Sequence, residues 1–140
     1  MKLKLIDYGY KKAPERAHHN DSGADVFAVS DVVLEPRTTT KVGIGLGVEL
    51  PDGYDIVMHC KSGMSSKGIF SSNAPIDAGY TGEIHAIITN TSEREYHIGK
   101  NVAVGQLVMF PIVLPYYTFD NINNNRGNGA FGSTGHADVE

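Results

Sequence analysis

The stretch KVGIGLGVEL, residues 41–50, decides the predicted fold. Every second residue of this stretch is apolar, namely Val42, Ile44, Leu46, Val48 and Leu50. Alternate side chains of a strand point to the same face, so the pattern predicts one strand whose apolar face lies on the core. Glycines occupy most of the other positions, and small residues inside a strand often let another element pack closely. We therefore interpret GIGLG as a packing feature and not as a phosphate-binding loop.

Three further segments show the same period of two: YDIVMHC (54–60), EIHAIITN (83–90) and NVAVGQLVMF (101–110). Turn-forming residues separate them, and no segment keeps a helical period over three turns. Short strands at regular spacing predict an all-β sandwich or barrel with jelly-roll topology. The predicted inward positions are Tyr54, Ile56, Met58 and Cys60, then Ile84, Ala86 and Ile88, then Val102, Val104, Gln106, Val108 and Phe110.

Length and composition restrict the class of protein. A chain of 140 residues fits one compact domain. Its net charge of -4, with both signs scattered along the chain, provides no cationic stripe for nucleic acid or for an anionic membrane. The single cysteine, Cys60, excludes an internal disulfide and a cysteine-based zinc cluster. The opening MKLKLIDYGY lacks the apolar run of a signal peptide, so we expect a soluble, cytoplasmic protein.

Four polar clusters fall at predicted strand ends and turns, where a rigid sheet can aim side chains at a ligand. They contain Asp25 in SGADVFA, Ser62 and Gly63 in KSGMSSKG, Asp77 and Tyr80 in the predicted hairpin NAPIDAGYTGEI, and Gln106. Each also has a plain structural explanation: a turn cap, a glycine-serine loop, an ordinary hairpin, and a core glutamine with satisfied hydrogen bonds. The residues alone leave both explanations open.

The segment RGNGAFGSTG, residues 126–135, has too little apolar surface to offset the entropy of ordering its backbone. A frayed terminus is the simpler interpretation. The alternative is a nucleotide clamp, in which glycine amides, Ser133 and Thr134 surround an anion and the Arg126 fork matches phosphate oxygens. Phe131 then offers a face on which a base can stack.

Taken together, SGADVFA, KSGMSSKG, NAPIDAGYTGEIHAIITN, VGQLVMFP and RGNGAFGSTG resemble the five ordered motifs of trimeric deoxyuridine triphosphatases (dUTPases). IDAGYTGEI and the FGSTG ending are the most specific parts. The resemblance implies a distorted jelly roll over residues 1–121 and a flexible C-terminal arm over residues 122–140. It also implies a homotrimer, with active sites between subunits and each arm closing over a neighbour's site.

The implied reaction is hydrolysis of dUTP to dUMP and pyrophosphate with Mg²⁺ as cofactor. By this resemblance, Asp77 orients and deprotonates the water that attacks the α-phosphorus, and Asp25 holds Mg²⁺ through its water shell. The resemblance assigns phosphate binding to Ser62, Gly63 and Gln106, with Lys61 beside them, and the terminal clamp to Arg126, Gly132, Ser133 and Thr134. Phe131 is assigned to uracil stacking.

The resemblance also implies how the substrate is selected. Tyr80 packs beneath the deoxyribose and leaves no room for a ribose 2′-hydroxyl. Backbone groups from Asn73 to Ile76 read uracil, because fixed donors and acceptors reject cytosine. His85, which we expect to point inward from the same hairpin, either lines this pocket or is an ordinary sheet histidine.

The sequence departs from the family pattern in places. Lys61 stands where the family usually has arginine, which keeps the charge but loses the bidentate fork. Ala103 and Ala130 replace a common basic residue and a common glycine. The alternatives are a dCTP deaminase, with or without dUTPase activity, and a non-catalytic nucleotide-binding regulator. Tyr80 and the complete FGSTG ending favour the hydrolase.

Overall fold

The computed structural model describes residues 1–72 and 74–122. In that part of the chain, antiparallel strands form four sheets, with orders β1-β5, β10-β3, β2-β11-β6-β8 and β4-β9-β7, and there is one helical turn, α1. The elements are β1 Lys4–Asp7, β2 Ala24–Phe27, β3 Val32–Leu34, β4 Thr39–Gly43, β5 Leu46–Glu49, β6 Tyr54–His59, α1 Ser62–Ser65, β7 Ile69–Ser71, β8 Pro75–Ile76, β9 His85–Asn90, β10 Tyr96–Ile98 and β11 Ala103–Pro111. The prediction of an all-β, jelly-roll-like fold is confirmed.

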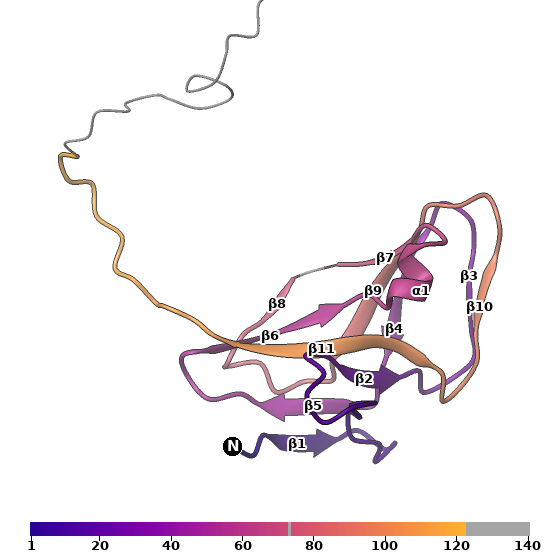
Figure 1. Cartoon of the computed structure of the whole chain (residues 1–140), viewed down its shortest axis with the longest axis horizontal. Helices are drawn as coiled ribbons and strands as arrows, with labels where there is room; N and C mark the ends of the chain where they lie inside the picture. The colour runs from indigo at the N-terminus through magenta and orange to yellow at the C-terminus, as the bar shows by residue number, and fades with distance from the viewer. Residues whose placement is uncertain (73, 123–140) are drawn as a thin grey trace, which may run out of the picture.

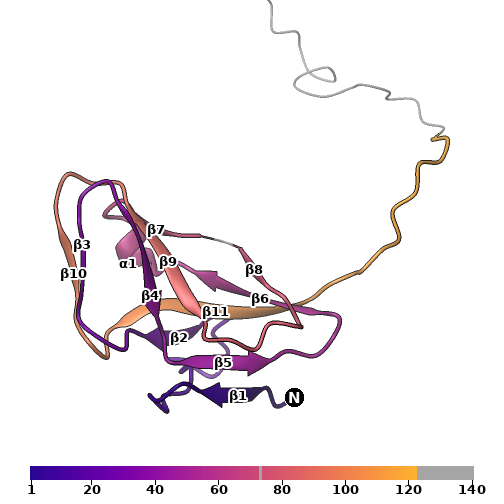
Figure 2. The ribbon, with the colours of Figure 1, turned by 180° about the vertical axis from the view of Figure 1, so that it is seen from behind.

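One apolar core joins the two larger sheets. Its buried residues come from β2, β6 and β11 of one sheet, from β4, β7 and β9 of another, and also from β3, β5, α1 and β10. Figures 1 and 2 show the β3 and β10 pair standing at one end of the body, with β1 and β5 along one edge. Alternating apolar residues thus give each sheet one face on the core, as the period of two requires.

The stretch from residue 41 to residue 50 forms two strands and not the single predicted strand. β4 ends at Gly43 and β5 begins at Leu46, and the two strands lie in different sheets. Gly45, between them, has a φ of 74°, which favours glycine. A Cβ atom on Gly45 would also lie 2.5 Å from the Cβ of Tyr10, so this glycine permits the close packing that GIGLG predicts. All five alternating apolar residues are nevertheless buried, because the side chains of both strands, and of Ile44 between them, point into the same core.

A bulge in β11 overturns the predicted inward register of that strand. The pairing of β11 with β2 shifts between Ala103 and Gly105. A bulge adds one residue to one strand and reverses the alternation beyond it. Val104, at the shift, is buried as predicted, whereas beyond it Leu107 is buried, Phe110 is exposed and Gln106 lies on the outer face. Val102, which precedes β11, is also exposed, contrary to the prediction.

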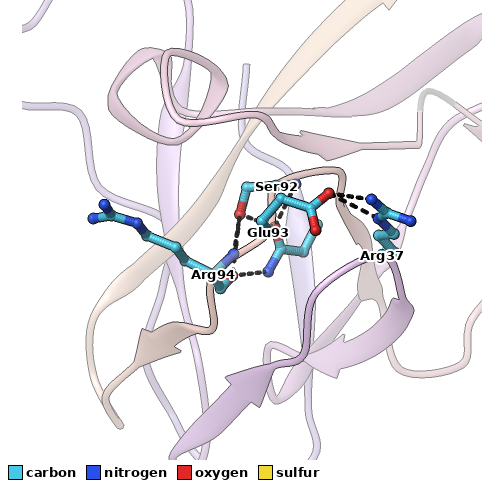
Figure 3. Close-up of polar contacts among 5 residues, drawn as sticks. Arg37, Ser92, Glu93 and Arg94 are labelled. Carbon is cyan, nitrogen blue, oxygen red and sulfur yellow. Dashed lines mark hydrogen bonds and ion pairs between the residues drawn. The ribbon is translucent and has the colours of Figure 1, made fainter.

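The last residue of β9, Asn90, is a buried asparagine with several hydrogen bonds. The Asn90 amide donates to the carbonyl oxygens of Leu34 and Arg94 at 2.9 and 2.7 Å, and its Oδ1 accepts from the amide and hydroxyl of Ser92. Figure 3 shows the Ser92 and Arg94 side of this network beside the ion pair between Arg37 and Glu93. A fully buried amide must be bonded in this way, so Asn90 fixes the connections at this end of the molecule.

Beyond β11 the chain leaves the body. The amide of Ile112 donates to the carbonyl of Gly53 at 2.9 Å, and Figure 1 shows the following residues running away from the sheets. Val113, Tyr116 and Phe119 are almost fully exposed. Over the described residues, no helix has the length and apolar character needed to span a membrane.

Candidate active site

A pocket of about 360 Å³ lies where β8 and β9 diverge. β8 pairs with β6, whereas β9 pairs with β4 and β7. The prediction that NAPIDAGYTGEI forms a hairpin is therefore wrong, because its two ends join different sheets. Six of the residues lining the pocket are Lys41, Ile76, Asp77, Tyr80, Glu83 and His85.

The turn after β8 presents the two most specific predicted residues. The Tyr80 amide donates to the Asp77 carbonyl at 3.0 Å, which closes the turn. Asp77 is exposed and the Tyr80 side chain is 47% exposed, so both can meet a ligand. Ile76 pairs with Ile56 of β6 and is half-buried. The pocket thus combines a free carboxylate, an aromatic ring and a strand edge.

His85 lines the pocket but does not point inward. It is half-buried on the face of β9 opposite to Ala86, and its Nε2 lies 3.9 Å from Glu83 Oε1. The alternation of β9 places Ile84, Ala86 and Ile88 on the core, so the intervening histidine has to face outward. His85 therefore lies where a residue that binds a ligand could lie, but the prediction that its side chain points inward is wrong.

A charged cluster forms at the other end of β6. Lys61 Nζ and Asp25 Oδ1 are 2.6 Å apart, and their side chains are 33% and 25% exposed. Gln106 stands opposite Asp25 across the strand pair, and its Nε2 donates to the Cys60 carbonyl at 3.3 Å. The Gln106 side chain also lies over Gly23, where a Cβ atom would be 2.2 Å from its Oε1. The predicted residues Asp25, Lys61 and Gln106 are thus brought together.

Ser62 and Gly63 open the single turn of α1 beside this cluster. Lys61 precedes them in an extended conformation, and its carbonyl accepts from the amides of Met64 and Ser65 at 3.0 Å. Both residues are exposed, and a Cβ atom built on Gly63 would meet nothing within 4 Å. The start of this turn is open to an anion beside the Lys61 ammonium group.

The donor groups suit a hard cation that keeps most of its water. Within the described residues, no three His, Cys, Asp or Glu side chains are grouped to hold a metal ion. One carboxylate, Asp25, fits Mg²⁺ that is held mainly by phosphate oxygens and its own water, while the open main-chain amides and the Lys61 ammonium group suit the phosphates themselves.

The two groups of residues lie at opposite ends of the same strand. Asp77 follows Ile76, which pairs with Ile56, whereas Lys61 comes five residues further along the chain. An extended chain rises by about 3.3 Å per residue, so roughly 15–20 Å separate the two groups within one protomer. The remaining predicted residues, Asn73, Arg126, Phe131, Gly132, Ser133 and Thr134, lie outside the described residues.

Sequence reasoning missed Glu83, which lines the pocket and accepts a hydrogen bond from the Gly45 amide at 3.0 Å. It also missed Tyr8, the residue directly after β1, whose hydroxyl donates to the Thr81 carbonyl. An acidic residue next to a strand usually faces solvent, and Tyr8 is distant in sequence. The local sequence therefore carries no signal for either contact.

The fold and the site define a nucleotide-binding jelly roll, with a shaped pocket and a charged loop at two ends of one sheet. The chain belongs to the dUTPase family, whose model matches residues 9–135. It is 34% identical to the deoxyuridine 5'-triphosphate nucleotidohydrolase of Clostridium tetani over 142 residues, which cover 96% of each protein. Identity to the enzyme of the same name from Tropheryma whipplei is 37% over 141 residues, covering 96% of this chain and 95% of that enzyme.

Solved structures agree with this assignment. A variant of the Staphylococcus bacteriophage 80alpha dUTPase with dUpNHpp has a TM-score of 0.85 and 29% identity, and covers 96% of this chain and 98% of its own. A variant of the dUTPase from phage phi11 of S. aureus, described with a structural Mg(II) ion, has a TM-score of 0.82 and 25% identity. That comparison covers 89% of this chain and 100% of the phage chain.

Proposed function

We propose that this chain hydrolyses dUTP to dUMP and pyrophosphate at a site assembled from more than one copy of itself. The activity is that of the dUTPase family. The observation that carries the assembly is the separation of Asp77 from Asp25 and Ser62 along β6. The attacking water and the phosphate-binding groups have to converge on one α-phosphorus, and one protomer holds them too far apart.

The pocket beside β8 is proposed to receive the deoxyuridine. Tyr80 places its ring beneath the sugar, and the backbone from Asn73 to Ile76 reads the edge of uracil. Main-chain donors and acceptors fixed by the β8–β6 pairing discriminate uracil from cytosine, because the wrong base leaves polar groups unpaired. The dUpNHpp bound by the phage relative supports a site for a deoxyuridine nucleotide.

Asp77 is proposed as the general base. Its carboxylate is exposed in the pocket and is held in a turn whose closing hydrogen bond joins Asp77 to Tyr80. A base next to the sugar-binding residue can hold a water in line with the α-phosphorus and accept its proton. The same turn thereby couples recognition of the sugar to the position of the water.

The cluster at the far end of β6 is proposed to receive the triphosphate. Ser62, Gly63 and Gln106 bind phosphate oxygens, Lys61 contributes positive charge, and Asp25 holds Mg²⁺ through water. When bound, Mg²⁺ neutralises the charge that develops on the leaving pyrophosphate. Gln106 is suited to this task because the bulge in β11 turns it toward Asp25 on the outer face.

A homotrimer is proposed as the active form, with each C-terminal arm reaching a neighbouring copy. Residues 112–122 support this, because the run leaves the body with its large apolar side chains exposed. Exposed apolar side chains that lie together in this way are typical of a surface that binds another chain. Arg126, Phe131, Gly132, Ser133 and Thr134 would then close over the neighbour's nucleotide. We place the enzyme in the cytoplasm, where free nucleotides occur.

Neither rival function is favoured. A dCTP deaminase needs a group aimed at the pyrimidine ring, and the family comparisons name dUTP hydrolases. A non-catalytic regulator has no need of Asp77, which stands free in the pocket.

The direct test is pyrophosphate release from dUTP, dCTP and dTTP, each with and without Mg²⁺. The proposal predicts rapid turnover of dUTP alone, and only with Mg²⁺ present. Equal turnover of dCTP, or ammonia release from it, would favour the deaminase. Binding of dUTP without pyrophosphate release would favour the regulator.

A further inference from the structure

The segment Thr81–Glu83, directly after the sugar-binding turn, is held at three points. The Tyr8 hydroxyl donates to the Thr81 carbonyl at 2.7 Å. The Tyr80 hydroxyl donates to the Glu83 carbonyl at 2.6 Å, and the Gly45 amide donates to Glu83 Oε2 at 3.0 Å. Two of these partners come from the β1 and β4–β5 regions, far away in sequence. The segment is therefore fixed to the body and not only to its own turn.

Two glycines let this segment lie between β5 and the Tyr80 ring. A Cβ atom on Gly47 of β5 would be 2.6 Å from the Gly82 carbonyl oxygen and 2.9 Å from that of Thr81. On the other side, a Cβ atom on Gly82 would be 2.7 to 3.0 Å from the hydroxyl oxygen, Cζ and Cε1 of Tyr80. Strand, segment and ring are stacked with no room for a methyl group between them. The position of the segment therefore sets the position of the ring.

We propose that Tyr8 and Glu83 are positioning residues that hold the Tyr80 ring where it excludes a ribose. This inference rests on the proposed role of Tyr80 in selecting deoxyribose. Steric exclusion of one hydroxyl needs a ring that cannot retreat, yet Tyr80 is only half covered by the protein. The Tyr80 hydroxyl donates to the Glu83 carbonyl, and the Glu83 carboxylate accepts from the Gly45 amide. The Tyr8 hydroxyl donates to the carbonyl of Thr81, the residue after Tyr80. The chain of contacts gives the ring the fixed support that exclusion requires.

The contact from Tyr8 is separable from the packing of the N-terminal strand. β1 is held to β5 by main-chain pairing from Lys4 with Glu49 to Asp7 with Leu46. Loss of the Tyr8 hydroxyl leaves that pairing intact. A change in sugar selectivity after Tyr8→Phe is then an effect on the Thr81 carbonyl and not an effect on folding.

The test compares kcat/KM for dUTP and for UTP in Tyr8→Phe and in the control Tyr96→Phe. Tyr96 is a partly buried tyrosine on β10, away from the pocket. One hydrogen bond of this kind accounts for about a three- to ten-fold effect, so the dUTP:UTP ratio should fall by that factor in Tyr8→Phe only. An unchanged ratio in folded Tyr8→Phe would overturn the proposal. An equal loss for both nucleotides would overturn it too, since a general defect is not a loss of selectivity.

A second pair of variants tests Glu83. Glu83→Gln keeps a side-chain oxygen that can accept from the Gly45 amide, whereas Glu83→Ala does not. The ratio should fall in Glu83→Ala and stay close to the wild-type value in Glu83→Gln. Equal ratios in the two variants would contradict the role of the Gly45 contact. If the wild-type protein does not hydrolyse dUTP, the proposed function itself fails, and that result is distinct from either outcome for the variants.

Discussion

The two ends of β6 differ in what they offer a ligand. Near Ile56 the strand borders a pocket formed by the turn with Asp77 and Tyr80, which is lined by a mixture of apolar, aromatic and charged residues. Beyond His59 the chain carries Lys61, which pairs with Asp25 in a half-exposed charged cluster. The first end suits a nucleoside and the second suits a phosphate chain. This difference is the basis of our proposal that each active site combines the pocket of one protomer with the charged cluster of another.

The largest effect should come from the pocket end. Asp77→Asn keeps the shape of the side chain but removes the proton acceptor. Removal of a general base typically lowers kcat by roughly 10²–10⁴-fold, and we expect a loss in that range. Affinity for a non-hydrolysable dUTP analogue, measured by calorimetry, should change by only a few fold. Comparable kcat values for the variant and the wild-type enzyme would refute the assignment.

Deleting residues 126–140 tests whether the two halves need the arm. We expect kcat/KM for dUTP to fall by roughly a hundredfold or more, because the proposed clamp on the terminal phosphate is removed. The oligomeric mass, measured by light scattering, should be unchanged. A fully active truncated enzyme would show that the arm is not required for closure.

The charged end should respond more moderately. Lys61→Ala removes the charge beside the proposed phosphate site and leaves Asp25 without its partner at 2.6 Å. Hydrogen bonds to charged groups support an expected loss in kcat/KM of roughly ten- to a hundredfold. Lys61→Arg, the matched control, should keep most of the activity because it retains the charge. An active Lys61→Ala enzyme would remove this residue from the phosphate site.

The smallest effect concerns acid stability at the end of β1, just before Tyr8. Asp7 Oδ1 accepts hydrogen bonds from the amides of Gly9, Tyr10 and Lys11, and the bond from Gly9 is the main cause that lowers the pKa of Asp7. A lowered folded pKa stabilises the fold above the ordinary value of 3.8 and loses that contribution as the pH falls through the folded value. The protection of the amides of residues 9–11, measured as their exchange rate relative to that of an unstructured chain at the same pH, should therefore fall as the pH drops below about 4. Asp7→Ala, which removes the acceptor, should show the lower protection already at neutral pH, and identical protection in both proteins would contradict this.

The sequence predicted the core well because most inward positions depend only on alternation. Ile56, Met58, Ile84 and Ala86 are all buried as expected. The errors arose where the backbone departs from a regular strand. In β11, both the odd-numbered and the even-numbered positions carry apolar residues. The alternation could therefore not locate the bulge that turns Gln106 outward.

The site was predicted less completely than the core. The motifs predicted Asp77, Tyr80, Asp25 and Lys61 as site residues, and the structure places them in a pocket and a charged cluster, but the supposed hairpin is split between two sheets. Sheet partners depend on contacts between distant segments, which a local pattern does not contain. The same reason explains why Tyr8 and its contact with Thr81 were missed.

The most direct test of the composite site mixes two inactive variants. Asp77→Asn and Asp25→Asn are purified separately, unfolded and refolded together in equal amounts, and assayed for pyrophosphate release from dUTP. If each site takes Asp77 from one copy and Asp25 from another, about a quarter of the sites in random assemblies regain both residues. Activity should then rise to about a quarter of the wild-type value refolded in the same way. Activity no higher than that of either variant refolded alone would contradict a site shared between copies.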